Sequence, residues 1–278
     1  MKKAMQIAYN DLFEMKCKFA SESGYDGIAV NFTEFLDKTE YEWEKLIEEI
    51  KDILEKYNLE CVQSHPYYYD LLVSSEVTEE RYEFAIKQAI IATGKLGGAW
   101  SVLHPRSSVS SGFFASKAFE DNRRVFDGYL ELAHKYNTGI AVENLPMFKG
   151  IYPDMQFYSC ICEDHAKLVD SFNDERMKAC WDTGHANMMY LDQAEAIKYM
   201  GNRIKCTHIH NNFRRLDDHL PPSNGTIDWQ KVMSAFVSVG YDGPLTLETN
   251  CSYNDPEMIK SFFDHGCECL KYLERAMQ

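Results

Sequence analysis

The chain has 278 residues, of which 45% are hydrophobic and 26% are charged, and its formal net charge is −14. This composition is typical of a globular protein with a buried core, and the negative charge disfavours a general binder of polyanions. We expect no membrane span, because no apolar run is long enough to cross a bilayer. The N-terminal stretch reaches polar residues too soon for a signal peptide. The nine cysteines are odd in number and scattered, so we expect free thiols in a reducing, cytoplasmic compartment.

Short apolar stretches alternate with longer segments of helical period along the whole chain. The predicted strands are Met5–Ala8, Gly27–Asn31, Glu60–Ser64, Ala99–Leu103, Gly139–Val142, Lys178–Trp181, Ile204–Ile209 and Leu245–Leu247. Predicted helices include Tyr41–Tyr57, Glu79–Leu96, Phe119–Tyr136 and Trp229–Val239. Eight strand–helix units in a chain of this length predict an α/β fold with one domain over residues 1–278, a single (β/α)8 TIM barrel.

An open, doubly wound sheet is the alternative architecture, and it would normally carry a glycine-rich phosphate loop after its first strand. The segment Asn10–Phe13 contains no glycine and does not fit such a loop. The tetrapeptide GYDG occurs at Gly24–Gly27 and Gly240–Gly243, each time between a helix and a strand, where its first glycine suits a helix C-cap. The aromatic segment Pro146–Ser159 is predicted to form a long loop over one mouth of the barrel.

Ionisable residues follow the predicted strands at their C-terminal ends, where the chemistry of such barrels is found. They are His65, His104, Glu143, Asp182, His185, His208, His210 and Glu248. One such residue alone is more often structural, but six consecutive strands contributing to one rim are hard to obtain by accident. Period-two alternation places each carboxylate above a small inward residue, which leaves room for a polar cavity. These oxygen and nitrogen ligands suit Mn²⁺, Zn²⁺, Co²⁺ or Mg²⁺.

Five motifs, VENLP, WDTGHAN, HIHNN, DDHLPPSNGTIDW and LTLETN, resemble those of the xylose-isomerase-like barrel superfamily. That superfamily groups sugar and sugar-phosphate isomerases and epimerases with the endonuclease IV type of apurinic-site nuclease. The resemblance implies that Glu143, Asp182, His208 and Glu248 bind one divalent metal ion, with Mn²⁺ or Zn²⁺ as the first expectation. Spacing alone leaves His208 and His210 open, because both share one strand face, and the resemblance selects His208.

The resemblance also implies residues that contact the substrate. His185 matches the substrate-contacting histidine of the ketose epimerases, and Arg214 falls where those enzymes carry a substrate-binding arginine. His210 is a further candidate contact beside them. Lys149 stands where the epimerases tend to have a glutamate, and a cation there would favour a phosphorylated or carboxylated substrate.

The expected reaction is proton transfer next to a carbonyl group in a sugar, a sugar phosphate or a related polyol or keto acid. Glu143 and Glu248 are predicted to remove and return the proton, while the metal ion stabilises the enediolate as a Lewis acid. Return to the opposite face gives an epimerase, and return to the neighbouring carbon gives an isomerase. Loss of a β-hydroxyl from the same intermediate gives a dehydratase, which is a second alternative.

The nuclease branch is the first alternative, because its three-zinc ligand pattern also finds matches here. Those matches are His65, His104 and Glu143 for one metal ion, and His185, Asp217 and His219 for another. Asp217 and His219 could equally brace their loop through hydrogen bonds. Duplex binding needs several phosphate contacts, whereas basic residues near the rim are few. We therefore expect a small carbohydrate as the partner rather than nucleic acid, and the sequence leaves a homo-oligomer and a non-catalytic sugar-binding barrel open.

Overall fold

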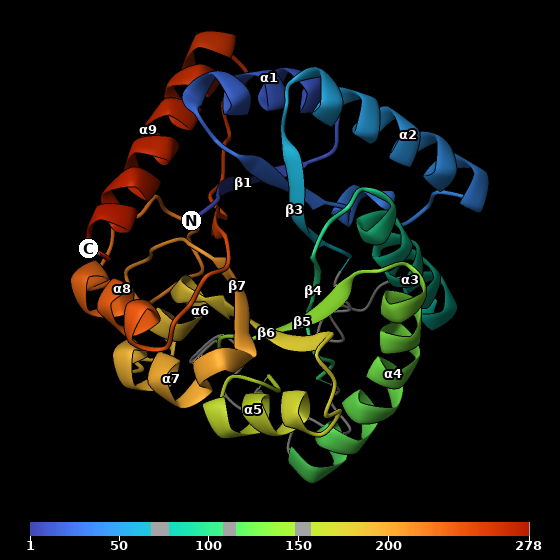
Figure 1. Ribbon diagram of the computed structural model, residues 1–278, viewed down its shortest axis with the longest axis vertical. Helices are drawn as coiled ribbons and strands as arrows, with labels where there is room; N and C mark the ends of the chain where they lie inside the picture. Colours follow the sequence, from blue (N-terminus) through green and yellow to red (C-terminus); the bar gives the residue numbers. More distant parts are fainter. Residues whose placement is uncertain (68–77, 108–114, 148–156, 278) are drawn as a thin grey trace.

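A computed structural model describes residues 1–67, 78–107, 115–147 and 157–277. Viewed down its shortest axis, the molecule is a ring of strands surrounded by helices (Figure 1). The strands are β1 (Lys3–Ala8), β2 (Gly27–Asn31), β3 (Glu60–His65), β4 (Trp100–Leu103), β5 (Gly139–Glu143), β6 (Met177–Asp182), β7 (Ile204–His208) and β8 (Leu245–Leu247). The helices are α1 (Phe13–Ser23), α2 (Glu40–Lys56), α3 (Glu79–Lys95), α4 (Ala115–Lys135), α5 (Cys162–Asp170), α6 (Thr183–Met188), α7 (Gln193–Met200), α8 (Trp229–Ser238) and α9 (Pro256–Arg275). Two short 3-10 helices, η1 (Thr33–Phe35) and η2 (Gly201–Arg203), complete the elements.

The eight strands form one parallel sheet in the order β7-β6-β5-β4-β3-β2-β1-β8. The remaining joint, between β7 and β8, is made by a parallel bridge between Ile209 and Leu247. At this joint the Ile209 amide donates to the Thr246 carbonyl over 2.7 Å, and the Glu248 amide donates to the Ile209 carbonyl over 3.1 Å. The chain is therefore a single (β/α)8 TIM barrel, as the sequence predicted.

Local sequence explains why the helices start and stop where they do. In α2, Thr39 and Glu42 form a capping box that satisfies free amides at the helix start. Its apolar residues, Trp43 and Ile47 among them, are buried on one face at three-four spacing. The predicted C-cap Gly24 is confirmed at the end of α1 with φ 93°, and Gly240 comes one residue after Val239, the C-cap of α8, with φ 67°. Such left-handed backbone favours glycine.

The barrel interior has an apolar layer below its C-terminal rim. Val102, Ala141, Cys180 and Cys206 are fully buried there, and Trp100 packs against them. All four lie two positions before a ligand candidate (His104, Glu143, Asp182 and His208), so these side chains leave space above them for the polar groups. None of the nine cysteines, all of which lie in the described ranges, forms a disulfide bond. Among the described residues, no helix is long and apolar enough to span a membrane.

Candidate metal centre

Four side chains from consecutive strands converge above this apolar layer. Glu143 ends β5, Asp182 ends β6, His208 ends β7, and Glu248 directly follows β8. One ligand atom from each lies within 4.8 Å of the others. His208 Nδ1 is 3.0 Å from Glu143 Oε1, 3.1 Å from Glu248 Oε2 and 3.9 Å from Asp182 Oδ2. This arrangement could hold one cation between three carboxylates and an imidazole.

Strand register and one neighbouring amide hold these side chains in place. Asp182 is the direct partner of His208 across the β6–β7 ladder, so the two residues leave the sheet at the same height. Asn144 fixes the Asp182 backbone, accepting from its amide over 2.7 Å and donating to its carbonyl over 2.9 Å. Asp182 Oδ1 also accepts from the His185 amide over 2.6 Å, and so caps α6. The ligand set is therefore built on rigid elements rather than on loops.

Electrostatics of the four residues favour a bound cation. Burial alone would raise the pKa of Glu143, but the charges of His208 and His104 outweigh it and hold that pKa well below its usual range. Burial alone would lower the pKa of His208, but Glu248 and Glu143 raise it well above its ordinary value. Glu248 Oε2 and His208 Nε2 are nevertheless buried and find no hydrogen-bond partner among the described residues. Buried charges and orphaned polar atoms are costly unless paired or bound to a metal ion, so the residues present fit such an ion.

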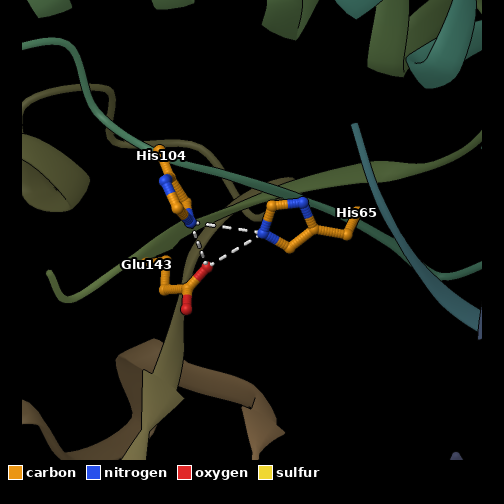
Figure 2. Close-up of side chains that lie close together, drawn as sticks. All are labelled: His65, His104 and Glu143. Carbon is orange, nitrogen blue, oxygen red and sulfur yellow. Dashed lines mark hydrogen bonds and ion pairs between the residues drawn. The ribbon is translucent and has the colours of Figure 1, made fainter. Parts of the chain in front are cut away.

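His65 and His104 form a second group with Glu143 (Figure 2), at its Oε2 atom rather than at the Oε1 atom that His208 approaches. His65 Nε2 and His104 Nε2 lie 3.4 Å and 3.1 Å from Glu143 Oε2, and 3.2 Å from each other. His65 comes from the end of β3, and its Nδ1 donates to the Pro66 carbonyl over 2.8 Å. That bond leaves the Nε2 lone pair of a neutral His65 facing the carboxylate. The three residues thus form a further group with the geometry of metal ligands.

A third group is built around Asp217, in the loop after β7. Asp217 Oδ2 lies 3.1 Å from both His185 Nε2 and His219 Nε2. Burial would lower the pKa of His185, but the charges of Asp182 and Asp217 raise it well above its usual range. Burial likewise opposes protonation of His219, yet its hydrogen bond to Asp217 and the nearby carboxylates raise its pKa to about 10. His185 and His219 therefore both contact Asp217, whereas of the two predicted extra ligand sets only the set of His65, His104 and Glu143 is found, among the described residues, with all its ligand atoms within 4.8 Å of one another.

His210, the rival of His208, faces a different part of the cluster. Its Nε2 lies 3.0 Å from Asp182 Oδ2, and its ring stacks on His219 with centroids 4.2 Å apart. A Cβ at Gly184 would come 1.9 Å from the His210 ring, so only glycine allows this approach. His208 lies within 4.0 Å of all three acidic residues of the four-residue set, Glu143, Asp182 and Glu248, whereas His210 lies near Asp182 and Asp217.

Arg214, one of the predicted substrate contacts, is placed away from this cluster. The exposed Arg214 donates from Nε to Asn187 Oδ1 over 3.1 Å and lies 5.3 Å above the Tyr190 ring. It lines a separate cavity with Asn187, Thr226 and other residues. This placement arises because the loop after β7 turns back through paired backbone hydrogen bonds between Asn211 and Leu220. Lys149, and most of the predicted loop Pro146–Ser159, lie outside the described residues.

Two cavities open onto the cluster and share Asn31, Thr33, His219 and Glu248 in their walls. The rim cavity, of about 240 Å³, is also lined by His65, His104, Pro105, Ser107, Glu143, Leu145, Pro146, Phe157, His185 and Asp217. The second, called here the amide cavity, measures about 460 Å³ and is also lined by Met5, Gln6, Ile7, Ala8, Asn10, Lys16, Thr249, Asn250, Cys251, Phe262 and Phe263. Both ligand glutamates thus face space that a small molecule can enter.

Sequence reasoning missed the residues that β1 and β2 contribute. Gln6 donates from Nε2 to Glu248 Oε1 over 2.6 Å and so orients a ligand candidate. Asn10 and Asn31 line the amide cavity beside it. A glutamine inside a predicted apolar strand was the available signal, because an amide in a strand needs a buried polar partner.

The fold places the chain among the (β/α)8 barrels. Within that class, the chain belongs to the xylose isomerase-like TIM barrel family, whose family model matches residues 17–269.

Individual relatives agree with this assignment. The uncharacterized protein y4fM of Sinorhizobium fredii is 30% identical over 47% of this chain, a match that spans 40% of y4fM. The uncharacterized protein MJ1311 of Methanocaldococcus jannaschii is 25% identical over 80% of this chain and 74% of its own length. The D-psicose 3-epimerase of Enterocloster bolteae is 28% identical over 31% of this chain and 27% of its own length.

Solved structures show the same architecture. A D-tagatose 3-epimerase-like protein covers all of both chains with a TM-score of 0.73 at 21% identity. The 3-keto-D-glucoside 4-epimerase YcjR from E. coli covers 99% of this chain and 100% of its own with a TM-score of 0.71 at 16% identity. At these identities the likeness establishes the shared fold.

Proposed function

We propose that this protein is a divalent-metal-dependent isomerase or epimerase of a sugar or sugar derivative. The convergence of Glu143, Asp182, His208 and Glu248 at one point of the rim carries the proposal. Relatives and structural neighbours named as D-psicose 3-epimerase, D-tagatose 3-epimerase-like protein and 3-keto-D-glucoside 4-epimerase support a carbohydrate substrate. Mn²⁺ and Zn²⁺ are the ions that this mixed carboxylate and imidazole set suits first.

Glu143 and Glu248 are the proposed proton carriers, one on each side of the substrate. Both line the rim cavity, and ion pairing holds the pKa of each carboxyl below its usual range, so each starts as a base. Bound between them, a divalent cation would act as a Lewis acid on the substrate carbonyl. One glutamate removes the proton next to that carbonyl, and the other returns one from the opposite side. His185, which lines the same cavity, is the proposed contact for a substrate oxygen.

Proton exchange tests this proposal directly. The protein, loaded with Mn²⁺, is incubated with ketohexoses and their phosphates in D₂O, and deuterium entering the substrate is followed by NMR. Glu248→Gln should abolish exchange, whereas Glu268→Gln, an equal charge change at an exposed helical site, should leave it unchanged. Metal content is measured on both variants. Lost exchange with the metal ion retained would mean that the base is missing, whereas lost exchange with the metal ion lost would mean that the ion is missing. A product lighter by one water would instead identify the dehydratase.

A nuclease is the second candidate, because the His65–His104–Glu143 and His185–Asp217–His219 groups match its additional zinc sites. Among the described basic residues at the rim, however, Arg106 is held in ion pairs with Glu79 and Glu83, and so does not face a phosphate backbone. Three zinc ions per chain, together with cleavage of an abasic-site duplex that Asp217→Asn abolishes, would favour the nuclease. One ion per chain and no cleavage would favour the epimerase.

A further inference from the structure

The amide cavity differs in chemistry from the metal cluster that it adjoins. It lies beside β1, β2, α1 and the segment after β8, and it shares a wall with the rim cavity at Glu248 and His219. Apart from those two residues, its polar wall consists of amides, hydroxyls and one lysine, Lys16 of α1. Most of the charge near the reacting centre is negative, so a cation in this position needs an explanation.

Hydrogen bonding fixes which atoms the amides present. Asn10 Oδ1 accepts from the Leu12 amide over 3.0 Å, and Asn31 Oδ1 accepts from the Thr33 amide over 2.8 Å and its hydroxyl over 2.6 Å. Because a backbone N–H can only donate, the accepting atom must be oxygen, and the NH₂ group of each asparagine is left for another partner. The same cavity is therefore lined by Lys16 and by two asparagines whose NH₂ groups remain available as hydrogen-bond donors.

Lys16 has no counter-charge of its own in the described part of the chain. It is half-buried, and no described carboxylate lies within 4.0 Å of its Nζ. The acidic residue in the cavity wall, Glu248, is engaged with Gln6 and His208. A partly desolvated ammonium without a partner costs free energy, which an incoming anion would recover. Charge-assisted hydrogen bonds are also the strong ones.

We infer that Lys16, Asn10 and Asn31 bind an oxyanion group, a carboxylate or a phosphate, at the far end of the substrate. This inference rests on the proposed function and deepens it, because it makes the substrate an acidic sugar derivative whose carbonyl end lies at the metal cluster. Lys16 is thus a specificity residue rather than a catalytic one. The two cavities hold the two ends of one molecule, with Glu248 at the junction.

Three substrates that differ only at carbon six provide the test. D-psicose, D-psicose 6-phosphate and the corresponding ketohexuronate are compared by deuterium exchange with the Mn²⁺-loaded protein. One of the two anionic sugars should exceed the neutral sugar by about tenfold or more in kcat/KM, which also identifies the oxyanion. Lys16→Met should remove that preference while leaving exchange of the neutral sugar intact, and Lys16→Arg should retain much of it. Lys18→Met, two residues along α1 at an exposed ion pair with Glu22, is the matched control.

A preference that survives in Lys16→Met, or no preference in the wild-type protein, would overturn the inference while leaving the isomerase proposal standing. If none of the three sugars exchanges, binding of inorganic phosphate and of acetate to the Mn²⁺-loaded protein is measured calorimetrically. Binding of either anion that is about tenfold weaker in Lys16→Met than in wild type would then support the oxyanion site despite failure of the proposed reaction. If Lys16→Met and the wild-type protein bound each anion equally well, the inferred oxyanion site would be overturned.

Discussion

Histidines are buried in two regions of the molecule, and their pKa values shift in opposite directions. In the layer between barrel and helices, His165 of α5 donates from Nε2 to the Val142 carbonyl over 2.8 Å, and burial lowers its pKa to about 4. At the rim, burial acts on His219 in the same direction, but Asp217 and Glu248 outweigh it and raise the pKa to about 10. Burial by itself therefore produces a neutral imidazole. At His219 the neighbouring carboxylates reverse that outcome, whereas at His104, also on the rim, burial outweighs the charge of Glu143 and lowers the pKa.

The largest expected effect comes from removing one of those carboxylates. Asp182→Asn takes a charge from the four-residue cluster, so divalent-metal affinity should fall by more than the roughly 10–100-fold typical of outer-shell changes, and exchange activity should be lost. Metal content after dialysis, measured by mass spectrometry, checks this. Asp192→Asn is the control, because Asp192 also caps a helix but lies outside the cluster. Equal metal retention in the two variants would mean that Asp182 is not a ligand.

The helix-layer histidine predicts a pH effect. The pKa of His165 is depressed by burial from 6.5 to about 4, so below pH 6.5 the unfolded chain binds a proton that the folded protein excludes. The stability that depends on a neutral His165 is present above pH 6.5 and is lost as the pH falls towards 4, by up to about 3 kcal/mol. Urea unfolding of wild type and His165→Gln across this range tests it. Parallel pH profiles would contradict the predicted role of burial.

A smaller effect is expected from Gln6, which supports the rim from β1. Gln6→Met keeps the volume but removes the hydrogen bond to Glu248 Oε1, so activity should fall about tenfold through misorientation of that carboxylate. Metal content should change less than in Asp182→Asn. Gln230→Met, at an exposed position of α8, is the matched control. Unchanged kcat and kcat/KM in Gln6→Met would show that Glu248 needs no such support.

The smallest effect lies in the helix layer, far from the cluster. Thr39→Ala removes the capping box of α2 and should lower the free energy of unfolding by about 1 kcal/mol. Thr39→Ser keeps the accepting oxygen and should retain most of the stability. Metal content should be equal in both variants. A difference in metal content would mean that the two regions are coupled more closely than their separate contacts indicate.

The fold could be predicted from sequence because strand and helix periods alternate clearly and glycines such as Gly24 and Gly240 mark the ends of helices. The metal-ligand candidates could also be predicted from the sequence, because parallel strands bring their C-terminal ends to one rim of the barrel. Gln6, Asn10 and Asn31 were missed because uncharged amides are common in strands and in the loops after them and carry no titration signal. The position of Arg214 could not be predicted from the sequence, because it depends on the pairing of Asn211 with Leu220 within the loop after β7.

The joint between β7 and β8 gives the cluster a mechanical role as well. The last strand has three residues, and its link to β7 is a bridge rather than a ladder. His208 ends β7 and Glu248 directly follows β8, so a metal ion bound by both would link these two strands where a single bridge closes the barrel. Metal binding would then stabilise the pairing of β7 with β8. Amide hydrogen exchange at Ile209 and Glu248 should therefore be slower in the metal-bound protein than in the metal-free protein.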